Sequence, residues 1–257
     1  NVGVRVLMHG TTIHGAQLMD NVATRGAGGR PSTITYFGPQ SPMALAFEAA
    51  KDNKDGPIRV GVVGLGAGTV ACFLRPEDAL DFYEIDRAVV EIALDPAKFE
   101  FVSTCKPDSR IVLGDARLML EDAPDGHYDL IVMDAFSSDA VPVHLLTREA
   151  MALYLRKLAP GGMIVSHVMN RHMELASVVA GIAAANGLVT RVMYSGLFES
   201  ERFIFGSSVA AVARSDEDFG TLHATGDWEI VEVDPGQRVW TDDFSNIVGA
   251  IIRQMRE

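Results

Sequence analysis

Apolar runs of strand length alternate with helical patterns along most of the chain after residue 57. The strands are predicted at 58–64, 80–86, 110–116, 128–136 and 161–168, and the clearest helices at 88–96, 144–158 and 173–187. Most of the predicted strands hold nearly continuous runs of Val, Ile and Leu, as required in a sheet that helices cover on both faces. The alternation predicts an α/β fold with a doubly wound, mostly parallel sheet.

The two ends of the chain depart from this rhythm. Residues 1–57 hold short β-prone runs at 4–10, 11–19 and 32–37 and end in a polar linker at 51–57, so we predict a small N-terminal β-rich domain there. Residues 58–257 are predicted to form the second domain, which holds the parallel sheet. Two β-prone runs at 202–208 and 209–214 predict an antiparallel edge hairpin, and 247–255 a last helix.

Composition narrows the classes of protein. The chain has 257 residues, 48% of them apolar, and a net charge of −12. It can bury a real core, and it lacks the basic face that a nucleic-acid binder needs, so a small cationic molecule is the better partner. Cys72 and Cys105 form no pattern and are expected to be buried thiols of a reducing compartment. With no signal peptide and no membrane-spanning run, a cytoplasmic location is predicted.

The strongest motif is a glycine loop between a predicted strand and helix. It consists of Gly64, Gly66 and Gly68, and Glu84 ends the next strand 20 residues after the first glycine. Glycines let a backbone approach a ligand, and such a carboxylate can bind both ribose hydroxyls. The third glycine of a dinucleotide site is replaced by Thr69, which favours a nucleoside without a pyrophosphate. The alternative is a tight turn with an incidental acid.

Polar residues follow two further strands. Asp115 and Ala116 end the third strand, where the carboxylate could receive an adenine amino group, and Asp134 ends the fourth. Ligands of open α/β sheets bind outside the carboxyl ends of the strands. The pattern predicts a site for an adenosine sulfonium compound of the S-adenosylmethionine type.

The order GxGxG, YEID, GDA, MDAFSSD and WTDD resembles the spermidine synthase (polyamine aminopropyltransferase) family, most of all its branch fused to a multispanning membrane region. The resemblance implies a methyltransferase-like Rossmann domain beside a small β domain. It implies aminopropyl transfer from decarboxylated S-adenosylmethionine to an amine such as putrescine, with release of methylthioadenosine. A homodimer and a fused or associated membrane region are also implied.

The resemblance implies roles for individual residues. Glu84 would bind the ribose and Asp115 the adenine, while Asp134 and Asp139 would flank the attacking amine. Tyr36 would match the family's active-site tyrosine, and Gln17 the end of a substrate-facing turn. An acid at the reacting nitrogen can accept its proton, and others can hold a distal ammonium. For Asp139 a solvated loop acid is the alternative. For Asp242 and Asp243 we favour capping of the last helix.

One departure leaves the donor open. The family's loop carries an acid for the donor's free amine where this chain has Ala67. An S-adenosylmethionine-dependent methyltransferase acting on a small molecule is therefore one alternative, and a non-catalytic regulatory domain that binds methylthioadenosine or polyamine is another. We expect no metal, since His9 and His14 lack a third ligand, and we expect structural roles for His167 and His172.

Overall fold

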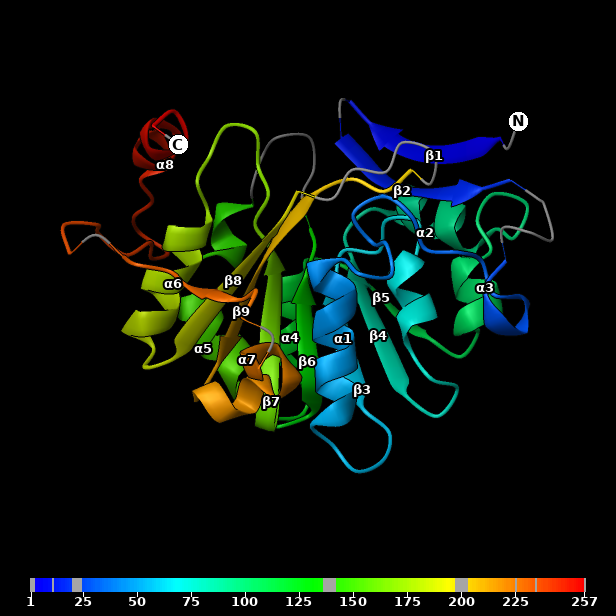
Figure 1. The fold of residues 1–257 in the computed structure, drawn as a ribbon, viewed down its shortest axis with the longest axis horizontal. Helices are drawn as coiled ribbons and strands as arrows, with labels where there is room; N and C mark the ends of the chain where they lie inside the picture. The colour runs from blue at the N-terminus through cyan, green and yellow to red at the C-terminus, as the bar shows by residue number, and fades with distance from the viewer. Residues whose placement is uncertain are drawn as a thin grey trace.

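An eight-stranded sheet forms the centre of the molecule (Figure 1). The computed structural model describes residues 3–10, 12–19, 25–135, 142–196, 203–224, 226–233 and 235–256. The strand order is β10-β8-β9-β7-β6-β3-β4-β5. The parallel strands are β3 (Arg59–Val63), β4 (Ala79–Glu84), β5 (Arg110–Leu113), β6 (Tyr128–Met133) and β7 (Leu158–His167). The predicted mostly parallel sheet is confirmed.

The remaining strands make an antiparallel edge. They are β8 (Val189–Ser195), β9 (Ser207–Ala213) and β10 (Glu229–Ile230), and β9 lies between β7 and β8. The predicted edge hairpin is therefore present, but one of its strands was predicted wrongly: β9 pairs with β8 at 189–195, and the described residues 203–206 form no strand beyond the isolated bridge at Ile204. Residues 189–195 mix apolar and polar residues without a regular period, so the sequence pattern does not mark this strand.

Helices cover both faces of the sheet, and two apolar clusters fill the space between. One cluster lies under α4 (Ala116–Glu121), α5 (Arg148–Lys157) and α6 (Ala176–Ala185). The other lies under α1 (Pro42–Asp52), α2 (Arg87–Leu94), α3 (Phe101–Cys105), α7 (Thr221–Ala224) and the 3-10 turns η3 (Thr69–Phe73) and η6 (Asp216–Phe219). Along β6, Ile131 and Met133 face the first cluster and Leu130 and Val132 the second.

The N-terminal segment divides differently from the prediction. The strands β1 (Val4–His9) and β2 (Thr12–Leu18) form an antiparallel hairpin, followed by the short turn η2 (Ala27–Gly29). Residues 32–37 form no strand; Thr35 makes an isolated bridge to Ile204. Helix α1 is capped by Ser41 and has Pro42 at its first turn, and its buried Phe47 belongs to the central core. The boundary at residue 57 stays a prediction, but α1 packs with the central sheet.

Side-chain caps begin several of the helices. Ser41, Asp86, Asp115 and Thr147 accept backbone N–H groups at the starts of α1, α2, α4 and α5. The last helix, α8 (Ile247–Gln254), is capped by Asn246, so the predicted capping role of Asp242 and Asp243 is wrong. The turn η4 (Val143–Leu145) precedes α5. Within the described ranges, the structure has no helix that is long and apolar enough to cross a membrane.

Candidate active site

The candidate site lies where the strand order reverses. From β3 the sheet continues through β4 and β5 on one side and through β6 and β7 on the other. Because these strands are parallel, their carboxyl ends meet at one edge, and this reversal point is where open α/β sheets bind ligands. Residues Gly64, Glu84, Asp115 and Asp134 follow or end β3, β4, β5 and β6. The sheet thus places all four predicted strand ends at the same edge.

The glycine loop turns sharply after β3. Gly64, Gly66 and Gly68 all have positive φ, at 95°, 52° and 82°. A Cβ on Gly64 would meet the backbone carbonyl of Asp134, with the carbonyl carbon 2.9 Å away, and real Cβ atoms essentially never come closer than 3.0 Å. The glycine at 64 is therefore required to bring the end of β3 against Asp134. The loop continues into the 3-10 turn η3 and not into the predicted α-helix.

Glu84 is fixed against this loop. One carboxylate oxygen accepts the Leu65 N–H at 2.9 Å, and the other accepts the Asp86 N–H at 2.9 Å. Glu84 as a whole is 8% exposed. A carboxylate has about four acceptor positions, so two hydroxyl groups can still bind. The geometry suits the predicted contact with two ribose hydroxyls.

The hairpin of β1 and β2 packs on the glycine loop. In Figure 1 the hairpin lies above the carboxyl ends of the parallel strands. The Ala67 N–H donates to the His14 carbonyl at 3.2 Å. A Cβ on Gly15 would lie 2.5 Å from the Ala67 Cβ. Ala67 is 1% exposed, so residue 67 is a packing contact between loop and hairpin. Burial and the neighbouring His9 lower the pKa of His14, against the opposing charge of Glu84.

Gln17 anchors the hairpin to the neighbouring helices. Its amide accepts the Glu100 N–H at 2.9 Å and donates to the Glu100 carboxylate at 3.0 Å. Arg25 also pairs with that carboxylate, at 2.9 Å. Gln17 therefore holds β2 against the start of α3, and its predicted contact with substrate stays a prediction.

Asp115 begins α4. Its carboxylate accepts the Leu118 N–H at 3.2 Å and contacts His144 Nε2 at 2.9 Å. Ala116, the first residue of α4, is 7% exposed. The side chain is thus oriented by the helix start, and its predicted binding of adenine stays a prediction.

Asp134 lies in a mostly covered cluster with Tyr36 and His167. Its Oδ1 is 3.5 Å from His167 Nδ1, and both side chains are nearly covered, at 14% and 13% exposed. The Tyr36 and His167 rings stack at 12° with their centroids 4.8 Å apart. Burial raises the pKa of Asp134 to about 7 and lowers the pKa of His167 to about 4. Burial and the charge of Asp134 raise the pKa of Tyr36 well above 10, so its hydroxyl stays protonated.

Asp242 makes its own set of contacts. Asp242 forms a bidentate pair with Arg117, both distances 2.7 Å, and accepts the Thr147 hydroxyl at 2.8 Å. The hydrogen bonds from Arg117 and Thr147 lower the pKa of Asp242 to about 2. Asp242 therefore joins the C-terminal segment to α4 and α5. Asp139 falls outside the described residues.

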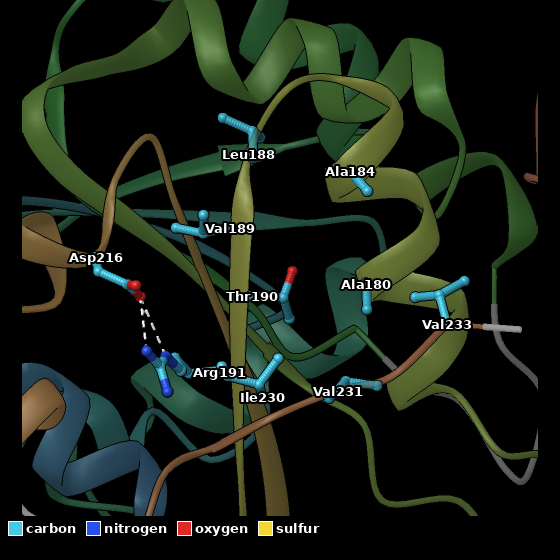
Figure 2. Close-up of a pocket in the computed structure, with 10 residues that line it drawn as sticks. All are labelled: Ala180, Ala184, Leu188, Val189, Thr190, Arg191, Asp216, Ile230, Val231 and Val233. Carbon is cyan, nitrogen blue, oxygen red and sulfur yellow. Dashed lines mark hydrogen bonds and ion pairs between the residues drawn. The ribbon is translucent and has the colours of Figure 1, made fainter. Parts of the chain in front are cut away.

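An apolar cavity of about 220 Å³ lies away from the site, between α6, β8 and the segment that follows β10 (Figure 2). Arg191 and Asp216 pair at its margin, at 3.0 Å. None of the predicted site residues lines it. In the part of the chain that the structure describes, no three His, Cys, Asp or Glu side chains form a group that could hold a metal ion.

Comparisons with known proteins bear on this fold. Over 119 residues, 44% of this chain, the sequence is 33% identical to a polyamine aminopropyltransferase from Vibrio vulnificus, and the match spans only 38% of that protein's length. A probable spermidine synthase from Corynebacterium glutamicum superposes over 95% of this chain and 94% of its own, with a TM-score of 0.60 and 17% identity. Spermidine synthase from Thermotoga maritima superposes over 96% of this chain and 84% of its own, with a TM-score of 0.53 and 14% identity. The chain has the spermidine synthase fold. No protein-family model matches it.

On this spermidine synthase fold, the two cysteines lie beside the glycine loop. Cys72 in η3 and Cys105 at the end of α3 form a disulfide, with their Cα atoms 4.9 Å apart. The expectation of two separate buried thiols is therefore wrong. Their spacing of 33 residues carried no pattern, and only the packing of η3 against α3 brings them together.

His167 is the site residue that the sequence reasoning missed within this spermidine synthase fold. It ends β7 just as Asp134 follows β6, so the rule that selected strand-end polar residues applies to it equally. A lone histidine after an apolar strand is more typical of a structural role, so the sequence pattern does not mark it. The parallel pairing of Met133 with Ser166 brings the two residues level.

Proposed function

We propose that this chain is an aminopropyltransferase. It would move the aminopropyl group of decarboxylated S-adenosylmethionine to a small cationic amine such as putrescine and release methylthioadenosine. The observation that carries the proposal is the buried Asp134, which follows β6 at the reversal point of a spermidine synthase fold, next to Tyr36 and His167. The Vibrio vulnificus relative is named a polyamine aminopropyltransferase, and a spermidine synthase with this fold has been solved with the transition-state analogue AdoDATO (TM-score 0.51).

The donor's adenosine would bind across the strand ends, with the ribose on Glu84 and the adenine near Asp115 and Ala116. Two buried polar atoms beside the glycine loop support a polar ligand there. Among the described residues, His14 Nε2 and Thr69 Oγ1 have no hydrogen-bond partner. Buried polar atoms are normally paired, so a ligand that supplies partners would remove this cost.

The amine must lose a proton before it can attack. A Lys-like ammonium with a pKa near ~10.4 costs about 4–5 kcal/mol to deprotonate at pH 7, at ~1.4 kcal/mol per unit. Asp134 would accept this proton, and burial that raises its pKa to about 7 makes it a better acceptor than an exposed carboxylate. The neutral hydroxyl of Tyr36 would orient the amine.

The transfer then needs orientation more than acid catalysis. The nitrogen lone pair forms a bond to the carbon beside the sulfonium, and the carbon–sulfur electron pair moves to sulfur. Methylthioadenosine leaves as a neutral thioether, so no proton has to be supplied to it. The secondary amine is formed as an ammonium, and the proton on Asp134 passes to solvent. Holding donor and amine in line is the site's main contribution.

Ala67 supports the methyltransferase alternative, because no acid at that position selects the decarboxylated donor. A homodimer, the membrane region and a role for Asp139 in holding the amine stay predictions. The cytoplasmic location also stays a prediction, and the Cys72–Cys105 disulfide argues against it, because disulfides persist mainly in oxidising compartments.

The test is an assay with both donors. The protein is incubated with putrescine and either decarboxylated or intact S-adenosylmethionine, and products are identified by mass spectrometry. We expect spermidine and methylthioadenosine from the decarboxylated donor, with a loss of roughly 100-fold or more in Asp134→Asn. S-adenosylhomocysteine from the intact donor would instead establish the methyltransferase, and ligand binding without either product the regulatory domain.

A further inference from the structure

His167 and Asp134 meet because of the register between two strands. His167 is the last residue of β7, and pairing of Met133 with Ser166 sets it beside Asp134. The Nδ1–Oδ1 distance of 3.5 Å puts the neutral imidazole within reach of the carboxyl group, and such contacts commonly shorten when substrate binds. On its other side the His167 ring lies flat against Tyr36. The histidine is therefore held between the two residues that the proposed reaction uses.

We propose that His167 is a positioning residue for Asp134, which holds the carboxylate toward the amine through Nδ1 and keeps its own orientation by stacking on Tyr36. The inference rests on the proposed aminopropyl transfer, because it assigns Asp134 its role as proton acceptor. It differs from the expectation that His167 is structural. A packing histidine would need only its ring, whereas a positioning one needs the Nδ1–H group.

The pair also determines where the amine's proton goes. The described contacts of His167 include two titratable groups, Tyr36 from the segment before α1 and Asp134 from the end of β6, and β9 presents the apolar Val209. With pKa values of about 7 and 4, Asp134 and His167 together hold one proton between about pH 4 and 7. Above pH 7 Asp134 is ionised and His167 is neutral, so Nδ1–H of His167 donates to the carboxylate and Asp134 accepts the proton of the ammonium.

Two replacements separate the ring from the donor. His167→Phe keeps a ring against Tyr36 but removes Nδ1, while His167→Gln keeps a side-chain N–H donor. We expect His167→Phe to lower kcat roughly 10- to 100-fold with a change in the KM for the amine of less than about 3-fold. Losing a donor to a buried carboxylate raises its pKa, so the acid limb of the pH–rate profile should move up by about one unit.

The kcat of His167→Gln should stay within about 5-fold of that of the unchanged protein, and the acid limb of its pH–rate profile should not move. His172→Phe is the matched control, because His172 is exposed and lies five residues away. It should change neither rate nor profile. If His167→Phe keeps both the rate and the acid limb, or if His167→Gln falls as far as His167→Phe with the same shift, Nδ1 does not act and the proposal is overturned.

A measurement without turnover keeps the two proposals apart. In the ¹⁵N spectrum of the histidine side chains, Asp134→Asn should shift the Nδ1 signal of His167 and change its titration, and leave that of His172 unmoved. An unchanged His167 signal overturns the positioning role even in an active enzyme. Failure of the unmodified protein to make spermidine, with this shift present, overturns aminopropyl transfer but keeps the Asp134–His167 pair.

Discussion

Gly64 joins the glycine loop to the proposed proton acceptor, and its replacement by alanine tests that join. The φ of 95° at this position costs an L-residue about 1–2 kcal/mol. The new Cβ would also meet the Asp134 carbonyl, whose carbon lies 2.9 Å away, inside the 3.0 Å limit that Cβ atoms respect. Backbone shifts of this kind cost about 1–3 kcal/mol more. We expect Gly64→Ala to lower the free energy of unfolding by about 2–5 kcal/mol.

Gly56→Ala is the matched control. Gly56 has a similar φ of 101°, but a Cβ there would have no atom within 4 Å. The backbone strain alone should therefore lower its free energy of unfolding, by about 1–2 kcal/mol. The difference between the two variants measures the contact with Asp134, and denaturant unfolding at one pH gives both values.

Activity gives the second measurement. A shift of the Asp134 backbone displaces its carboxylate, and misplacement by about 1 Å can cost roughly 100-fold in rate. We expect Gly64→Ala to lose at least about 10-fold in kcat at a temperature where it is fully folded, and Gly56→Ala to lose nothing. Equal stability and equal activity of the two variants would refute the view that Gly64 is needed to seat Asp134.

Two further predictions concern stability. The double replacement of Cys72 and Cys105 by serine opens a 33-residue loop and should lower the free energy of unfolding by about 3–4 kcal/mol. A reductant should lower the free energy of unfolding of the unchanged protein and leave that of the double variant as it is. Equal stability of the two proteins would contradict a contribution from the disulfide. Between about pH 4 and 6.5, the raised pKa of Asp134 makes stability fall with pH, and the lowered pKa of His167 makes it rise, so the two slopes cancel. Asp134→Asn should therefore gain about 1.4 kcal/mol of stability per pH unit there relative to the unchanged protein, measured by urea unfolding at pH 4.5 and 6.5, and parallel curves would contradict the shifts.

The central sheet could be predicted because its strands are covered on both faces. Runs such as 130–133 are apolar at every position, as a strand covered on both faces requires. Helix α1 carried its own signals, Ser41 at the N-cap and Pro42 after it, but lay within a segment taken as β-rich. Strand β8 mixes apolar and polar residues without a regular period, at the edge where covering by helices is incomplete.

The candidate site could be predicted only as far as topology determines it. The ends of parallel strands meet whatever their register, so Glu84, Asp115 and Asp134 could be grouped from the sequence. The contact of Asp134 with His167 depends on the register of β6 and β7, which no local pattern reveals. The pairing of Asp242 with Arg117 joins positions 125 residues apart and replaced the expected helix cap.

Position 67 shows how the fold changes the meaning of a sequence departure. The missing acid suggested an open place for a donor's carboxylate, but Ala67 is covered by β2, with its amide bound to the His14 carbonyl and its Cβ facing Gly15. The hairpin instead brings the His14 side chain beside Gly66, and burial lowers the pKa of that histidine, so it is neutral at pH 7. Neither residue 14 nor residue 67 then offers a charge that attracts an ammonium or repels a carboxylate. Selection between the two donors must therefore rest on other contacts, and a charge introduced at residue 14, by His14→Asp, should favour the decarboxylated donor in the two-donor assay.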